Sequence, residues 1–169
     1  AVPISRRIGK RSTFAVSCIG MAILSCFFFY LPCTNVGFVT MLLLQILISV
    51  CTGIISPLIW SMYADVADYA AIKDNTSSTG LIFSSGSMAQ KFGGAIAGSA
   101  VLWLFASFGL VPNALHQTDS AILGMKLTMS YIPAVVAVIM VVIMVVYPLT
   151  MSKMKDVNAK LKDIRKIEY

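Results

Sequence analysis

The chain has 169 residues, of which 58% are hydrophobic and 12% are charged, and its mean hydropathy is +0.86. A soluble domain carries about 45–50% apolar and about 25% charged residues, so this composition excludes an ordinary soluble protein and indicates an integral membrane protein. The net charge of +6 could suit a nucleic-acid partner, but the basic residues gather near the chain ends, where membrane orientation explains them better. No nucleic-acid partner is therefore expected.

The hydrophobic pattern predicts an all-α protein with four transmembrane helices, because each span needs roughly 20 apolar residues. A basic loop at 1–12 precedes this four-helix region at 13–149, and a basic tail follows at 150–169. The predicted spans are 13–31, 37–63, 80–109 and 127–149. The second span is longer than a bilayer requires, so it is expected to tilt or to project from the membrane, and Pro57 is expected to kink it.

The second predicted span ends in an acidic segment that contains Asp65 and Asp68. Residues three apart lie on one face of a helix. Negative charge is unfavourable at a helix C-terminus, so a basic residue from a neighbouring cytoplasmic loop is expected to compensate. The two acids either are solvated or form a charge latch that closes the cytoplasmic side.

The third predicted span carries a charge in its middle, Lys91. Counted from Gly80, Lys91 lies about 16 Å along the helix, near the midplane of a hydrocarbon core about 30 Å thick. An ionisable residue at that depth is costly and marks a functional site. The chain offers no acid at the same depth. Lys91 must therefore pair with a missing part of the protein or with a ligand, or it must lose its proton. Small and polar residues share its helical face: Ser84, Ser87, Gly94 and Gly98.

Gly94 and Gly98 form a GxxxG pair, which allows helices to approach closely and predicts a helix-packing role. In the tail, apolar residues recur at spacings of three and four, which predicts an amphipathic helix with a basic face on the membrane surface. These residues are Met151, Met154, Val157, Leu161, Ile164 and Ile167. The alternative is a frayed, solvated tail.

Lys and Arg are distributed unevenly between the two sides of the predicted spans. Four precede the first span, one lies between the second and third spans, and six lie in the tail, whereas the segment between the third and fourth spans holds one. Cytoplasmic loops carry the excess of basic residues. The sequence therefore predicts a multi-pass protein of the cell membrane with both termini in the cytoplasm.

The sequence offers no arrangement of residues that would support catalysis. It has no nucleophile–base set, no glycine loop that would cradle phosphate and no His or Cys cluster with metal-ligand spacing. The four cysteines form no CxxC pair, and most lie in apolar runs where Cys behaves as a small hydrophobe. We therefore expect no enzyme, no metal and no bound cofactor.

Residues 64–98 resemble the signature of the glycoside–pentoside–hexuronide:cation symporters, the melibiose-permease group of the major facilitator superfamily. The matching residues are Asp65, Asp68, Tyr69, Lys73, Gly80-Leu81-Ile82-Phe83-Ser84, Gln90-Lys91 and Gly93. The opening PISRRIGKR and the segment GLVPNA at 109–114 also resemble loops of that group. The chain departs from the pattern at Ala70-Ala71, which replaces Gly-Glu, and at Ser77, where a basic residue is common.

The resemblance implies that the four helices are the last four of a twelve-helix fold, joined in the whole protein by missing N-terminal helices. It implies alternating-access symport of a sugar or glycoside with a coupling cation, either proton or sodium. Lys91 and Ser87 would lie by the sugar and cation pocket, and Asp65 and Asp68 would serve the cytoplasmic gate. The alternatives are a small non-transporting membrane scaffold or assembly subunit, and an oligomeric channel in which Lys91 forms a selectivity ring.

Overall fold

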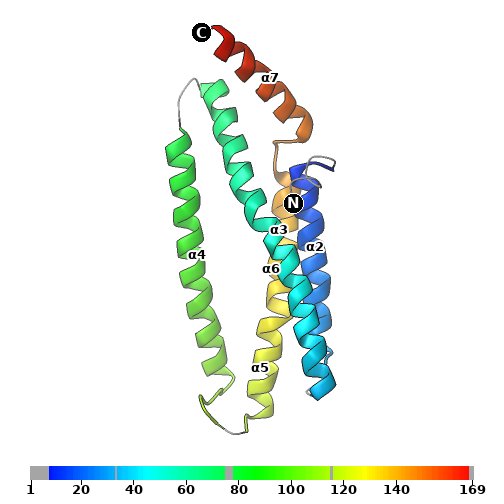
Figure 1. Cartoon of the computed structure of the whole chain (residues 1–169). Helices are drawn as coiled ribbons and strands as arrows, with labels where there is room; N and C mark the ends of the chain where they lie inside the picture. Colours follow the sequence, from blue (N-terminus) through cyan, green and yellow to red (C-terminus); the bar gives the residue numbers. More distant parts are fainter. Residues whose placement is uncertain (1–7, 33, 75–77, 115, 168–169) are drawn as a thin grey trace.

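The computed structural model describes residues 8–32, 34–74, 78–114 and 116–167, and over these residues it contains helices and no strand (Figure 1). The prediction of an all-α protein is therefore confirmed. The helices are α2 (Lys10–Phe29), α3 (Asn35–Asp74), α4 (Thr79–Ser107), α5 (Asp119–Met129), α6 (Tyr131–Val146) and α7 (Met151–Ile167).

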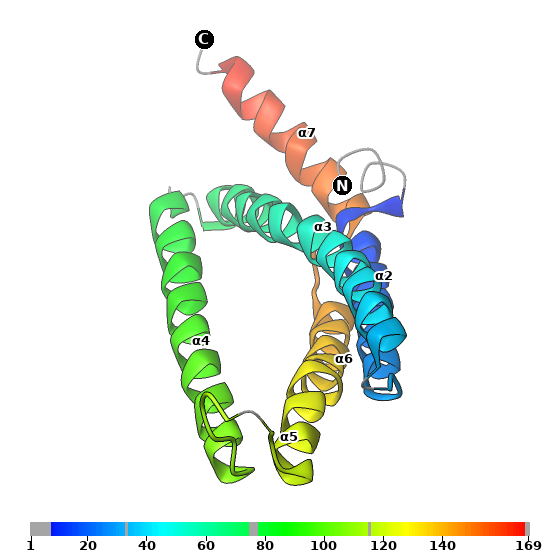
Figure 2. The same ribbon diagram turned by 60° about the horizontal axis from the view of Figure 1, so that its bottom comes forward.

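Helices α2, α3 and α6 form the packed part of the molecule, with α2 in contact with both others. The buried core joins Phe14 and Cys18 of α2 to Ile55 and Leu58 of α3, and Met140 of α6 packs against it. Helix α4 stands apart from this group along most of its length (Figure 2). Among the described helices, α4 contacts α3 of this packed group and also contacts α5.

Helix α3 is longer than the span predicted at 37–63, because it continues without a break to Asp74. The prediction that the helix ends at the acidic segment with Asp65 and Asp68 is wrong, because residues 64–74 continue the helix. This segment contains four alanines and neither Gly nor Pro before Asp74, so nothing in it stops a helix. At 40 residues α3 is about 60 Å long, twice the thickness of a hydrocarbon core. It bends along its length and contains Pro57, which removes one helical hydrogen bond (Figure 2).

Helix α4 ends where the sequence predicted the third span to end. Gly109 adopts a positive φ of 74°, which glycine accepts without strain. Its N–H donates to the carbonyl of Ala106, and the N–H of Leu110 donates to the carbonyl of Phe105, both at 3.0 Å. These two bonds make a Schellman motif, which fixes the direction of the chain as it leaves α4.

The span predicted at 127–149 is two helices, α5 and α6, separated at Ser130. The helical stretch begins earlier than predicted because the side chain of Thr118 accepts a hydrogen bond from the N–H of Ala121 and caps α5. The break follows from Pro133, which has no N–H to offer to the carbonyl four residues earlier and would clash with it. Ser130 is buried and donates its hydroxyl to the carbonyl of Lys126 at 2.6 Å.

Three helical stretches are long and apolar enough to cross a membrane, as judged over the described residues. They are Lys10–Phe29, Asn35–Lys73 and Asp119–Val146. Helix α4 is a fourth long helix, but its serines, glycines, Gln90 and Lys91 lower its hydropathy. In the most apolar part of α3 only 6% of residues are buried within the chain, so its surface is left for lipid or for other helices.

Helix α4 meets α5 at a close contact that predicts a measurable effect. A Cβ added to Gly124 would lie 2.7 Å from the Cβ of Phe108, which cannot rotate away. Gly124→Ala should therefore push the helices apart and cost about 1–3 kcal/mol. Helix propensity returns about 1 kcal/mol, so we expect a net fall of about 2–4 °C in the thermal midpoint of the detergent-solubilised protein.

Gly80→Ala is the matched control for this substitution. Gly80 lies in α4, and an added Cβ there meets no atom within 4 Å. Its midpoint should stay within about 1 °C of the wild type or rise. Equal midpoints for the two variants would mean that the contact between α4 and α5 is not tight.

Candidate functional site

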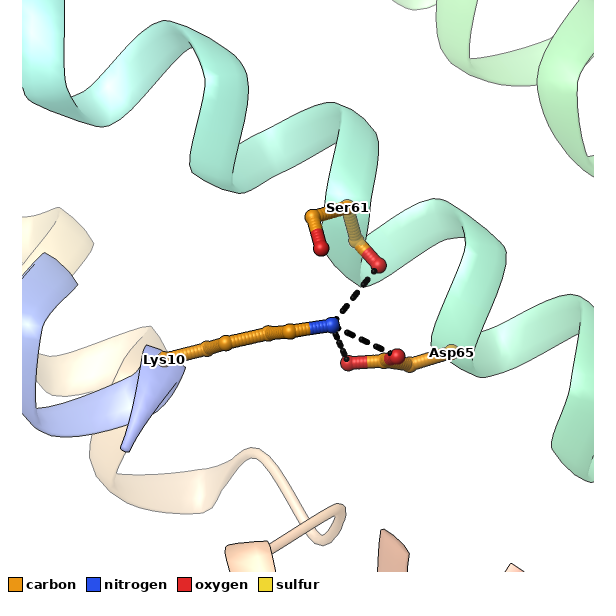
Figure 3. Close-up of polar contacts among 3 residues, drawn as sticks. All are labelled: Lys10, Ser61 and Asp65. Atoms are coloured by element: carbon orange, nitrogen blue, oxygen red, sulfur yellow. Dashed lines mark hydrogen bonds and ion pairs between the residues drawn. The ribbon is translucent and has the colours of Figure 1, made fainter. Parts of the chain in front are cut away.

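An ion pair joins the start of α2 to the interior of α3. Lys10 Nζ lies 2.7 Å from each carboxylate oxygen of Asp65 and donates a further hydrogen bond of 3.4 Å to the carbonyl of Ser61 (Figure 3). The Asp65 side chain is 15% exposed and that of Lys10 is 36% exposed, so water screens the pair only in part. The basic partner expected for the acidic segment is therefore Lys10.

The same end of the molecule is tied to α6 by a second basic residue. Arg11 Nη2 donates to the carbonyl of Val145 at 2.6 Å, near the C-terminus of α6. Cations are favourable at helix C-termini because the last carbonyls lack intrahelical partners. Lys10 and Arg11 together fasten the start of α2 to both neighbouring helices.

Tyr147 lies directly after α6 and lines the same cavity as Lys10 and Asp65. Its hydroxyl is buried and, among the described residues, has no hydrogen-bond partner. Burial, and then the negative charge of Asp65, raise the pKa of Tyr147 to about 12. The phenol therefore stays protonated at neutral pH and well above it.

Asp65 and Asp68 do not lie at a helix C-terminus, and that part of the sequence prediction is wrong. Helix α3 continues beyond them to Asp74, and the helix dipole acts strongly only over the last turn. Asp68 is half-buried, and its carboxylate has no ion pair with any described side chain. The structure thus distinguishes a paired acid from an unpaired one, and the gating role of both stays a prediction.

Lys91 lies about 18 Å from the start of α4, in a part of the helix that the rest of the chain leaves bare. Every residue from 88 to 100 is exposed, and no described side chain forms an ion pair with Lys91. Ser87, one turn earlier, is half-buried. The described structure does not bring Lys91 to the Lys10–Asp65 pair, which lies on other helices.

The two glycines predicted for helix packing lie in the same bare stretch. A Cβ added to Gly94 or Gly98 would meet nothing within 4 Å. No described helix packs on them, so their packing role stays a prediction that depends on other helices.

The contact between α3 and α4 is aromatic and lies near Ser87. The rings of Trp60 and Phe83 stack with centroids 6.1 Å apart, and Tyr63 meets Phe83 edge-on at 6.2 Å. The buried Gly86 faces the Tyr63 ring so closely that a Cβ there would overlap it. This contact fixes where α4 leaves α3. The exposed stretch of α4 therefore begins directly after Ser87.

Sequence reasoning missed Tyr147 as part of the charged end of the molecule. The available signal was its position at the end of an apolar run, because tyrosines are enriched at membrane–water interfaces. Its approach to Asp65 joins residues far apart in the chain, which no local pattern reveals.

Comparison with known proteins decides the family. Residues 1–151 match the model of the family described as MFS/sugar transport protein. The chain belongs to this family. This MFS/sugar transport family is a family of transporters rather than enzymes, and its membership, with the apolar helices, makes the chain part of a multi-pass membrane protein.

The relatives of this MFS chain agree with the resemblance to glycoside–pentoside–hexuronide:cation symporters. A glucuronide carrier protein homolog of Escherichia coli is 27% identical over 96% of the chain and 35% of the relative. A second Escherichia coli protein, provisionally named glycoside/cation symporter YagG, is 24% identical over 92% of the chain and 33% of its own length. An uncharacterised 29.9 kDa protein of Pseudescherichia vulneris is 28% identical over 96% of the chain and 59% of its length.

The chain therefore spans about a third of the length of the two Escherichia coli relatives. No solved structure matches the chain significantly.

Proposed function

We propose that the chain is the C-terminal third of a secondary active transporter that takes up a sugar or glycoside together with a cation, proton or sodium. The observation that carries the proposal is Lys91, a charge in the middle of α4 on a stretch where every residue is exposed. A lysine at such a depth normally faces a polar cavity or a partner rather than lipid. The transporter family and the names of the relatives supply the substrate class.

In this proposal the bare face of α4 packs against helices that precede the chain in the whole protein. Lys91 and Ser87 line the central cavity from one side, and Gly94 and Gly98 let a neighbouring helix approach. The Lys10–Asp65 pair holds the cytoplasmic ends of α2 and α3 together, with Asp68 close by. Transport then proceeds by rocking this bundle against the missing helices, with the site fixed near the midplane.

The non-transporting scaffold is the weaker alternative, because the chain belongs to a family of transporters. Uptake of a radiolabelled glucuronide or glycoside by cells that express the full-length protein tests the choice. We expect accumulation above the external concentration that collapses when the proton or sodium gradient is dissipated. Equal internal and external concentrations with every sugar and both gradients intact would contradict symport.

The proposed orientation places both termini, α7 and the end of α3 in the cytoplasm of the cell. It rests on the excess of Lys and Arg at that end of the molecule. Single cysteines at Lys73 and His116 in a background without native cysteines test it. A membrane-impermeant maleimide added to intact cells should label position 116 and spare position 73. The reverse pattern would overturn the orientation.

A further inference from the structure

A cavity of about 550 Å³ lies beside the Lys10–Asp65 pair. It is bounded by the start of α2, by Asp65 of α3, and by α7 together with the segment that joins it to α6. Its volume falls within the range of roughly 300–1,000 Å³ that small-molecule sites occupy. In Figure 1 this region is where the start of α2 and the beginning of α7 come together.

The charge on the cavity wall favours an anion. Three cationic side chains, Lys10, Arg11 and Lys155, face one carboxylate, Asp65. Lys10 already neutralises Asp65, whereas Lys155 has no ion pair with a described side chain. Arg11 uses Nη2 for the Val145 carbonyl and has further N–H donors to offer.

A neutral donor, the Asn158 side chain, also lines the cavity. Tyr147 lines it as well, but its hydroxyl is buried, so a ligand in the cavity does not reach that group. A planar guanidinium with ammonium and neutral donors is the set that binds the oxygens of a phosphate group. The remaining wall includes the thioether side chains of Met62 and Met154, which suit apolar atoms attached to such a group.

The position of the cavity relative to the apolar surface indicates which kind of phosphate compound could reach it. The neighbouring outer surfaces of α2 and α6 are apolar, since Val16 and Val145 are each 65% exposed and Val146 is 77% exposed. The cavity lies where these surfaces end, and lipid headgroups flank the hydrocarbon core at that level. A lipid whose phosphate entered the cavity would lay its acyl chains along the exposed valines.

We propose that this cavity binds the phosphate of an anionic phospholipid headgroup, held by Arg11 and Lys155 with Asn158 as a neutral donor. Free phosphate has the same chemistry, so the test includes it. A general attraction between a basic helix and an anionic membrane would treat all exposed lysines of α7 alike. Lys153 and Lys155 are both exposed, but only Lys155 lines the cavity.

Native mass spectrometry of the full-length protein in neutral detergent, titrated with short-chain phosphatidylglycerol, measures this difference. Lys155→Gln should weaken binding of phosphatidylglycerol about five- to tenfold, the loss of one charge-assisted hydrogen bond. Lys153→Gln, which removes the same charge from the same helix, should change it less than twofold. Short-chain phosphatidylcholine should bind the wild type at least tenfold more weakly.

Three results would overturn the proposal. Equal effects of the two lysine substitutions would show that lipid binds by general attraction to the basic surface and not in the cavity. Equal affinities for phosphatidylglycerol and phosphatidylcholine would show that the cavity does not select an anionic headgroup. Displacement of phosphatidylglycerol by millimolar inorganic phosphate, lost in Lys155→Gln, would reassign the cavity to a soluble phosphate compound.

Discussion

Substitution of Lys91 by methionine is expected to abolish concentrative sugar uptake by the full-length protein. Methionine keeps most of the length of the side chain and removes its charge, so the packing of α4 changes little while the cavity loses its cation. A lysine at the bilayer centre costs about 2.5–3.5 kcal/mol on insertion, so the variant should insert at least as well as the wild type. Sugar accumulation normalised to inserted protein is the measurement.

Two further substitutions sharpen the test of Lys91. Lys91→Arg should also fail, because a planar guanidinium does not replace a compact ammonium in a confined site. Ser87→Ala should reduce uptake about fivefold, the value of roughly 1 kcal/mol for one hydrogen bond. Lys73→Met, the same change at an exposed residue at the end of α3, is the control and should transport normally. Full accumulation by Lys91→Met would show that Lys91 serves helix packing and is not needed for transport.

Breaking the Lys10–Asp65 pair should produce the second large loss. Asp65→Asn leaves the Lys10 ammonium partly buried without its carboxylate, which costs about 1–2 kcal/mol for a pair with this exposure. A cost of that size lowers the population with a closed cytoplasmic end about five- to thirtyfold. We expect uptake to fall about tenfold.

Exchange of the two residues separates an ion pair from general damage. The double variant Lys10→Asp, Asp65→Lys keeps both charges and the combined side-chain length, so it should recover at least half of the uptake. Asp156→Asn, at an exposed position of α7, should leave uptake unchanged, and Asp68→Asn should have an effect smaller than that of Asp65→Asn because Asp68 has no described ion-pair partner. If the exchanged pair transported no better than Asp65→Asn alone, the charges would not act as a latch.

The hydrophobic pattern of the sequence predicts where the helices lie. It does not predict where α3 ends, where α5 begins or where α5 and α6 separate. Thr118 and Pro133 were available signals for the start of α5 and for the break before α6, but Asp119 and Lys126 made the segment look like a loop. The alanines after Asp65 likewise indicated a longer α3. Polar residues occur in exposed helical turns as well as in loops, so helix propensity and capping decide where α3 ends and α5 begins.

The candidate site was predictable only in part, because its contacts join distant segments. The sequence indicated that Asp65 needs a basic partner, but the first segment offers several basic residues. Only the packing of α2 against α3 selects Lys10. In the proposed transporter the surroundings of Lys91 belong to helices outside this chain, so its role would depend on residues that neither the sequence nor the described structure contains.

The length of α3 has a mechanical consequence. A helix of about 60 Å held near its centre, where Ile55 packs in the core, acts as a lever whose arms are each about 30 Å long. A tilt of about 10° therefore displaces each tip by about 5 Å. A rotation too small to disturb the apolar packing around Ile55 would thus be amplified at Lys73, where an attached spectroscopic probe would register it.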